Sequence, residues 1–169
     1  MGTSTSQERT RVQINELARA GIITALYVAV SMMLSVIAYG PLQIRLSEMF
    51  NYLGLFHKRY IAAVTLGVVI VNFFSPMWFL DVPIGGVGTF LCLLIARAAA
   101  KKFTDLKVKM VITAIIFSLS MFTVAAQLFL VFDLPFWPTY FSVAVGELFS
   151  MTVGGIIIYF LSKKIDFTK

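Results

Sequence analysis

Long uncharged runs separated by short charged segments dominate the hydropathy pattern of the chain. A helix needs roughly 20 apolar residues to cross a hydrocarbon core of about 30 Å. Five runs meet this length or approach it, and the pattern predicts five membrane helices within 20–39, 60–80, 82–100, 110–132 and 134–162. Two prolines limit these helices. We expect the helix within 60–80 to end near Pro76 and the helix within 134–162 to begin after Pro138.

A sixth apolar segment, 46–56, is short for a span, at about 16 Å as an α-helix. The basic residues decide how to interpret it. If this segment crosses and the N-terminus is cytoplasmic, thirteen of the 14 Lys and Arg residues fall on one side, which is the positive-inside bias. The sequence therefore predicts an all-α membrane protein with six transmembrane helices, a short second helix and both termini in the cytoplasm.

Composition supports this assignment. The 169 residues are 59% hydrophobic and 13% charged, whereas a soluble domain has about 25% charged residues. The net charge of +6 is explained by topology rather than by nucleic-acid binding, and the lone cysteine, Cys92, excludes an intrachain disulfide. We expect one membrane domain over 20–164, between a cytoplasmic segment 1–19 without signal-peptide features and a tail 165–169.

Polar residues interrupt the apolar pattern at "PLQIRLSEMFNYL", 41–53, where Arg45, Glu48 and Asn51 follow one another at intervals of three. Residues three apart share a helix face, so Arg45 and Glu48 can pair. Ionisable residues in a span cost at least about 2.5–3.5 kcal/mol and therefore face a cavity or a partner. A structural ion pair holding a short helix and a ligand site are both compatible with this pattern.

Two more polar residues lie at similar depths in other helices. By helical rise, Asn72 lies about 18 Å from the cytoplasmic end of its helix, and Glu147 about 14 Å from the outer end of the last. Together with the polar residues of 41–53 they can converge on an outward-facing pocket. Asn72 as a purely interhelical contact, and Glu147 as a buried acid or a partner of Arg45, remain open alternatives.

The segment "FSPMWFLDVPIGGVGTF", 74–90, is expected to break the helices at Pro76, Asp81 and Pro83. Irregular backbone near a membrane surface lies where it is wet or lines a cavity. Asp81 is thus a candidate pocket residue. Trp78, at the outer end of a helix, fits either the pocket wall or an interfacial aromatic belt.

Small residues recur every fourth position on the first helix, at Gly21, Ala25 and Ala29. Such stripes let another helix approach closely. Spacing alone favours packing inside the protein's own bundle over a partner subunit. No catalytic, nucleotide-binding or metal motif occurs, so we expect a binding protein with no catalytic residues, cofactor or metal.

Several stretches carry a resemblance to a known family. "ARAGIITALYVAVSMM" resembles the first helix of the substrate-binding (S) components of energy-coupling factor (ECF) transporters. "YGPLQIRLSEMFNYLGLF", "GVVIVNFFSP", "LDVPIGGVGTFLCLLIA" and "VGELFSM" are similar to the QueT family, in the same order over about 20–164. "SPMWFLDV" departs from it, because a shorter, more glycine-rich loop is expected there.

The resemblance implies an S component that captures a queuosine precursor, a deazaguanine, outside the bacterial plasma membrane. A transmembrane coupling subunit, contacted through Ala25 and Ala29, and two cytoplasmic ATPase subunits would complete the importer. Glu147, or else Glu48, would accept from adjacent ring N–H donors. Asn72 would bind the carbonyl or a ring nitrogen, Asp81 or Glu48 would bind an aminomethyl cation, and Trp78 would stack on the ring.

Three other functions stay open from the sequence. The protein could be an S component for another vitamin or an aromatic amino acid. It could be an intramembrane enzyme that uses Glu48 or Glu147 as a general base. It could also be a structural membrane subunit whose charges only pair with one another.

Overall fold

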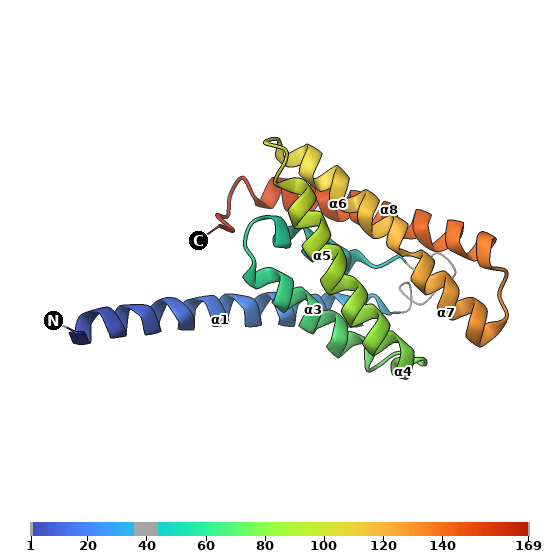
Figure 1. Ribbon diagram of the computed structural model, residues 1–169, viewed down its shortest axis with the longest axis horizontal. Helices are drawn as coiled ribbons and strands as arrows, with labels where there is room; N and C mark the ends of the chain where they lie inside the picture. Colours follow the sequence, from blue (N-terminus) through green and yellow to red (C-terminus); the bar gives the residue numbers. More distant parts are fainter. Residues whose placement is uncertain (1, 36–43, 169) are drawn as a thin grey trace.

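A computed structural model describes residues 2–35 and 44–168, and every regular element in those ranges is helical (Figure 1). In chain order the elements are α1 (Gly2–Met33), η1 (Leu46–Leu55), α3 (Arg59–Asn72), α4 (Trp78–Leu80), η2 (Asp81–Gly85), α5 (Gly86–Ala100), α6 (Leu106–Ser120), α7 (Phe122–Phe132) and α8 (Phe136–Leu161). Residues 36–43, which include the end of the predicted 20–39 helix and the start of the "PLQIRLSEMFNYL" segment, lie outside the described residues.

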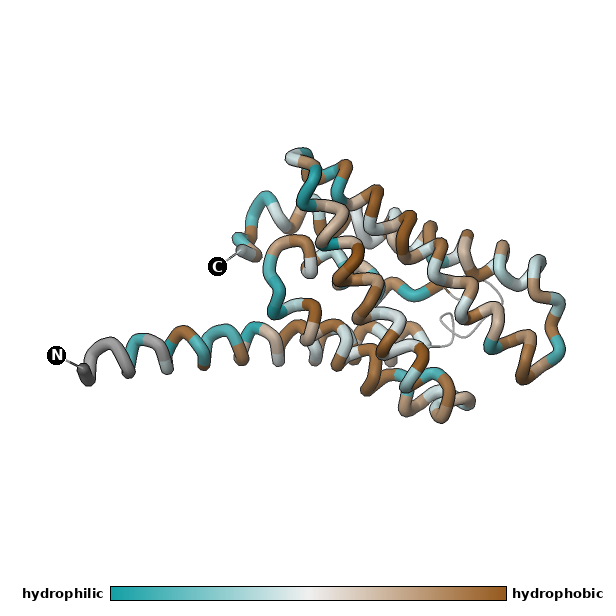
Figure 2. Tube along the Cα trace, in the orientation of Figure 1, coloured by the Kyte–Doolittle hydropathy of each residue, from teal (hydrophilic) through white to brown (hydrophobic). Residues whose placement is uncertain are grey.

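Four helical units in the described chain are long and apolar enough to cross a membrane: 10–33, 78–100, 106–132 and 136–161. Helix α3 is apolar but has only 14 residues. Hydrophobic residues predominate along these units (Figure 2). Many of their large apolar side chains are exposed, as expected where the surrounding solvent is lipid. The protein is therefore an all-helical membrane protein, whereas six spans and cytoplasmic termini stay predictions.

The short segment after Arg45 forms a 3-10 helix, η1, rather than an α-helix. A 3-10 helix rises about 2.0 Å per residue, so ten residues extend about 20 Å, further than an α-helix of that length. Seven residues of η1 are buried, which places it among the other helices. Arg97 of α5 donates hydrogen bonds to the carbonyl oxygens of Gly54 (2.5 Å) and Leu55 (3.4 Å) and so satisfies its C-terminal end.

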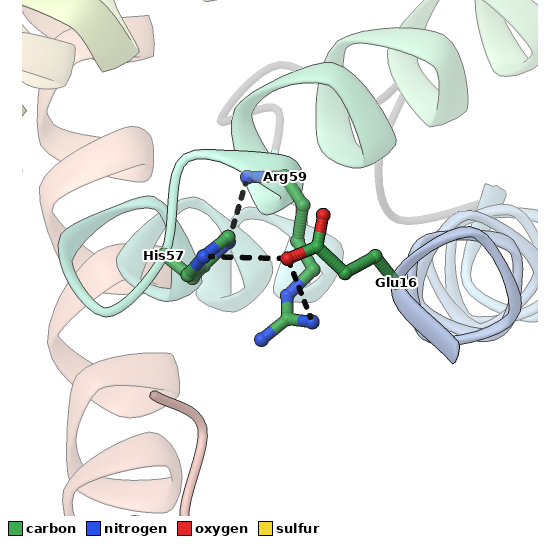
Figure 3. Close-up of polar contacts among 3 residues, drawn as sticks. All are labelled: Glu16, His57 and Arg59. Atoms are coloured by element: carbon green, nitrogen blue, oxygen red, sulfur yellow. Dashed lines mark hydrogen bonds and ion pairs between the residues drawn. The ribbon is translucent and has the colours of Figure 1, made fainter. Parts of the chain in front are cut away.

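Helix α1 continues without interruption through the polar N-terminal segment and projects beyond the other helices (Figure 1). Glu16, in this projecting part of α1, makes ionic contacts with the turn between η1 and α3. Its Oε1 lies 3.9 Å from Nε2 of His57 and 4.0 Å from the Arg59 guanidinium, while the Arg59 backbone N–H donates to Nδ1 of His57 (3.2 Å; Figure 3). The described part of the predicted 1–19 segment, from Gly2 on, is thus helical.

The prolines act differently from the sequence-based expectation at two places. Helix α8 begins at Phe136, before Pro138, because the first turn of a helix does not use the N–H that proline lacks. Asp81 and Pro83 do not break the chain's helical path: they form the π-helical turn η2, which joins α4 to α5 as one unit. A π-turn absorbs the missing donor of Pro83. Pro76 does lie at an interruption, between α3 and α4.

Candidate ligand-binding site

A cavity of about 200 Å³ lies between the end of α3, the turn leading to α4, η2 and α7. Arg45, the residue that directly precedes η1, also lines this cavity. The cavity combines charged and amide groups with apolar walls, as small-molecule sites do. Its lining residues are Arg45, Asn72, Ser75, Pro76, Met77, Asp81, Gly85, Val124, Gln127, Leu128 and Phe132.

Asp81 organises the polar wall of this cavity. Its Oδ2 accepts a short hydrogen bond from the Ser75 hydroxyl, and its Oδ1 accepts from Nε2 of Gln127 (3.2 Å). Its backbone carbonyl accepts from the Asn72 amide (2.7 Å). Gly85 makes this last bond possible, because a Cβ there would overlap the Asn72 amide nitrogen. The π-turn therefore ties α3 and α7 together through one carboxylate and one carbonyl.

A second polar group lies deeper, where α1, η1 and α8 meet. Glu48 is 6% exposed; its Oε1 accepts from the Tyr27 hydroxyl (3.0 Å) and its Oε2 from the Asn51 amide, in a short bond. The 3-10 conformation explains this geometry, because three residues per turn place positions 48 and 51 directly above each other. Tyr27 reaches Glu48 past Gly67, where a Cβ would lie 2.9 Å from the tyrosine ring.

Glu147 of α8 is 2% exposed, and its Oε1 has no hydrogen-bond partner among the described residues. Oδ1 of Asn51 is in the same situation. Buried polar atoms almost always have a partner, so an exception calls for an explanation such as a missing ligand or water. One buried carboxylate oxygen and one amide oxygen can thus accept hydrogen bonds from a ligand.

Arg45 links the two polar groups. Arg45 lines the cavity. Its backbone N–H donates to the Ser150 hydroxyl (2.9 Å), which in turn donates to the carbonyl of Gly146 (2.8 Å). This chain of bonds holds the start of η1 against α8, one turn from Glu147.

The structure separates the seven predicted binding residues into three places. Arg45, Asn72 and Asp81 line the cavity. Glu48, Asn51 and Glu147 are buried and do not line it. Trp78 is 53% exposed and stacks on Phe73, with ring centroids 6.3 Å apart, so it lies away from the cavity, as in an interfacial belt.

Sequence reasoning missed three polar partners of these residues. Ser75 and Gln127 bind the carboxylate of Asp81, and Tyr27 binds that of Glu48. For Gln127 a usable signal exists, because it is a polar residue within an apolar run. A serine before proline and a tyrosine in a helix are too common to single out.

The small-residue stripe of α1 does not pack inside the protein's own bundle. Gly21, Ala25 and Ala29 are exposed, and a Cβ at Gly21 would meet nothing within 4 Å. They line an almost entirely apolar groove between α1 and α3, of about 620 Å³. Spacing alone favoured the opposite interpretation, which is therefore wrong. The stripe is a smooth outer face.

An all-helical membrane protein with a polar cavity between its helices and no metal-binding cluster among its described residues has the build of a membrane transport protein. Comparison with known families agrees: residues 17–164 match the QueT transporter family, and the chain belongs to that family. The predicted membership is confirmed, and it makes the protein a transport protein rather than an enzyme.

A curated relative is the queuosine precursor transporter QueT of Lactococcus lactis subsp. cremoris (strain MG1363). The two sequences are 38% identical over 163 residues, an alignment that covers 91% of this chain and 96% of the relative. No solved structure matches the chain.

Proposed function

We propose that the protein captures a queuosine precursor, a deazaguanine, at the cavity and carries it into the cell. The observation that supports this most strongly is the buried Oε1 of Glu147, which has no hydrogen-bond partner among the described residues. The family and the name of the lactococcal relative supply the substrate class. A deazaguanine has two adjacent N–H donors, which a carboxylate accepts in a directional, charge-assisted pair of bonds.

In this proposal Glu147 binds the donor edge of the ring, with Asn51 close by. Asn72 binds the ring carbonyl or a remaining nitrogen through its amide. Glu48 holds Tyr27 and Asn51 in place. Asp81 shapes the wall, and its charge attracts an aminomethyl cation at the cavity. Trp78 has no place in this arrangement except as a residue that anchors the outer loop at the membrane interface.

The uptake mechanism we propose is that of an ECF S component in the plasma membrane of a bacterium. Six spans with cytoplasmic termini place the basic residues inside, in line with the positive-inside rule. The exposed face of Gly21, Ala25 and Ala29 supports a helix partner, because small residues let two backbones approach closely. That partner is a transmembrane coupling subunit, and two ATPase subunits supply the energy.

Direct binding tests the substrate. The purified protein in detergent is titrated with a deazaguanine, guanine, riboflavin and tryptophan, while tryptophan fluorescence and heat are recorded. We expect a deazaguanine to bind tightest and Glu147→Gln to weaken it by about 10- to 100-fold, the value of a hydrogen bond to a charged group. Asp133→Asn is the matched control, since Asp133 is an exposed carboxylate in the α7–α8 turn.

Each other result has a defined meaning. Binding of riboflavin or tryptophan alone would keep the transport role and change the substrate. No binding to folded protein would favour a structural subunit. Conversion of the ligand by this chain alone would favour an enzyme. Co-purification with a coupling subunit, lost on Ala25→Leu with Ala29→Leu but kept with an exposed Ile22→Leu control, would test the proposed partner.

A further inference from the structure

A second groove lies between α6 and α8, which run side by side (Figure 1). It has a volume of about 290 Å³, and its lining is apolar except at its ends. From Lys107 to Ala114 it follows α6 for about 10 Å, and from Met151 to Phe160 it follows α8 for about 14 Å. These lengths correspond to about half of a 30 Å hydrocarbon core, the depth of one lipid leaflet.

Two lysines stand at the open, basic end of this groove. Nζ of Lys163 lies 4.6 Å and Nζ of Lys107 5.5 Å from the centre of the same ring, that of Tyr159. Tyr159 itself lines the groove, as does Lys107. Neither ammonium has an ion-pair partner within 4.0 Å in the described part of the chain. Two unneutralised cations held beside one ring form a local site for an anion.

The two carboxylates nearest to these lysines in the sequence accept hydrogen bonds from backbone N–H groups. Asp105 accepts from the backbone N–H of Lys107 (2.8 Å) and caps α6, and Asp166 accepts from the backbone N–H of Thr168 (2.9 Å). The N-terminal end of α6 adds a partial positive charge at the same place. The electrostatics and the apolar groove below it therefore suit one molecule that is anionic at one end and hydrocarbon at the other.

We propose that this groove binds one anionic phospholipid. Its phosphate lies between Lys107 and Lys163 above Tyr159, and one acyl chain lies along Val111, Gly155 and Ile156. Gly155 provides depth, since a Cβ there would lie 3.2 Å from the Tyr52 hydroxyl at the base of the groove. In the orientation proposed above the lipid belongs to the cytoplasmic leaflet, whose anionic lipids basic pockets between helices bind.

Native mass spectrometry of the detergent-purified full chain tests this site. The protein is incubated with dioleoyl phosphatidylglycerol or with dioleoyl phosphatidylcholine, which share acyl chains and differ in charge. We expect about tenfold greater retention of phosphatidylglycerol, lost when Lys107→Gln and Lys163→Gln are combined. Lys101→Gln with Lys102→Gln, two exposed lysines of the α5–α6 turn, should leave retention unchanged. Ile156→Trp, which fills the groove and keeps both lysines, should reduce it several-fold.

Three results would overturn the proposal. The first is equal retention of the two lipids. The second is a loss of retention in the Lys101→Gln and Lys102→Gln control as large as in the Lys107→Gln and Lys163→Gln variant. The third is displacement of phosphatidylglycerol by inorganic phosphate. The last result would mean a simple anion site without a role for the groove. If the variant that combines Lys107→Gln and Lys163→Gln does not fold, Lys163→Gln alone and Ile156→Trp still decide between these outcomes.

Discussion

The two polar groups of this protein differ in how completely their carboxylates are satisfied. At the cavity, both oxygens of Asp81 accept hydrogen bonds from neighbouring side chains. In the deeper group Glu48 is equally well supplied, whereas Glu147 keeps one buried oxygen without a partner in the described chain. Satisfied carboxylates hold helices together, and an unsatisfied one has capacity for a ligand. Three substitutions test whether this distinction is real, and a fourth measurement tests the charged turn at the other end of the bundle.

The largest expected effect is on stability, from Glu48→Ala. It leaves two buried donors, the Tyr27 hydroxyl and the Asn51 amide, without their acceptor. Unsatisfied buried donors cost about 1–3 kcal/mol each, so a loss of about 2–6 kcal/mol is expected for two, visible as a lower Tm in detergent. Tyr27→Phe removes one donor only and should cost about 0.6–1.7 kcal/mol. Equal Tm values for wild type and Glu48→Ala would contradict the structural role of Glu48.

Glu147→Gln should show the opposite behaviour. We expect Kd for the deazaguanine to rise about 10- to 100-fold, or about 1.4–2.8 kcal/mol, while Tm in the absence of ligand stays the same or increases. The substitution changes a buried carboxyl group to an amide but breaks no hydrogen bond to Oε1, because that atom has no partner in the described residues. A large fall in Tm without a change in Kd would make Glu147 structural and end the distinction.

Gln127→Ala tests the cavity wall. It removes one of the two side-chain donors to Asp81 and should cost about 0.6–1.7 kcal/mol of stability, the range for interhelical hydrogen bonds in membranes. The matched control is Thr152→Ala, which removes a hydroxyl bonded only within α8. Thermal unfolding of both variants in the same detergent makes the comparison, and a larger loss for Thr152→Ala would argue against a cross-helix role for Gln127.

The smallest effect concerns pH at the opposite end of the bundle. Partial burial, and then the charge of Arg59, lower the pKa of His57 from its usual value. The unfolded chain then binds more protons at moderately acidic pH, so stability is lost as pH falls through about 6.5. We expect a small decrease in Tm between pH 7.5 and 5.5 that His57→Gln reduces. An identical pH dependence in the variant would exclude His57 as its source.

The apolar runs determined most of the helical architecture. Uncharged runs of about 20 residues can only be helices in lipid, where the backbone must satisfy its own hydrogen bonds. The helical units 78–100, 106–132 and 136–161 follow from that requirement. The predicted breaks were less accurate, because a proline is harmless in the first turn of α8 and is absorbed by a π-turn at Pro83.

The candidate site was predictable only as a set of residue types. An amide or a carboxylate in an apolar run marks a residue that needs a partner, and so Asn72, Glu48, Asp81 and Glu147 could be singled out. Which of them are already satisfied depends on side chains from distant parts of the sequence. Tyr27 donates a hydrogen bond to Glu48 from 21 residues away in the sequence, and Gln127 donates one to Asp81 from 46 residues away.

The tertiary structure alone decided which faces are covered. Spacing cannot tell whether the stripe of Gly21, Ala25 and Ala29 packs inward, since inner and outer stripes have the same period of four. Only the position of α3 leaves that face open. The sequence thus determined which segments are helical and apolar enough to cross a membrane, through short-range hydropathy. The fold determined which polar atoms and which apolar faces remain available, because that depends on contacts between segments far apart in the chain.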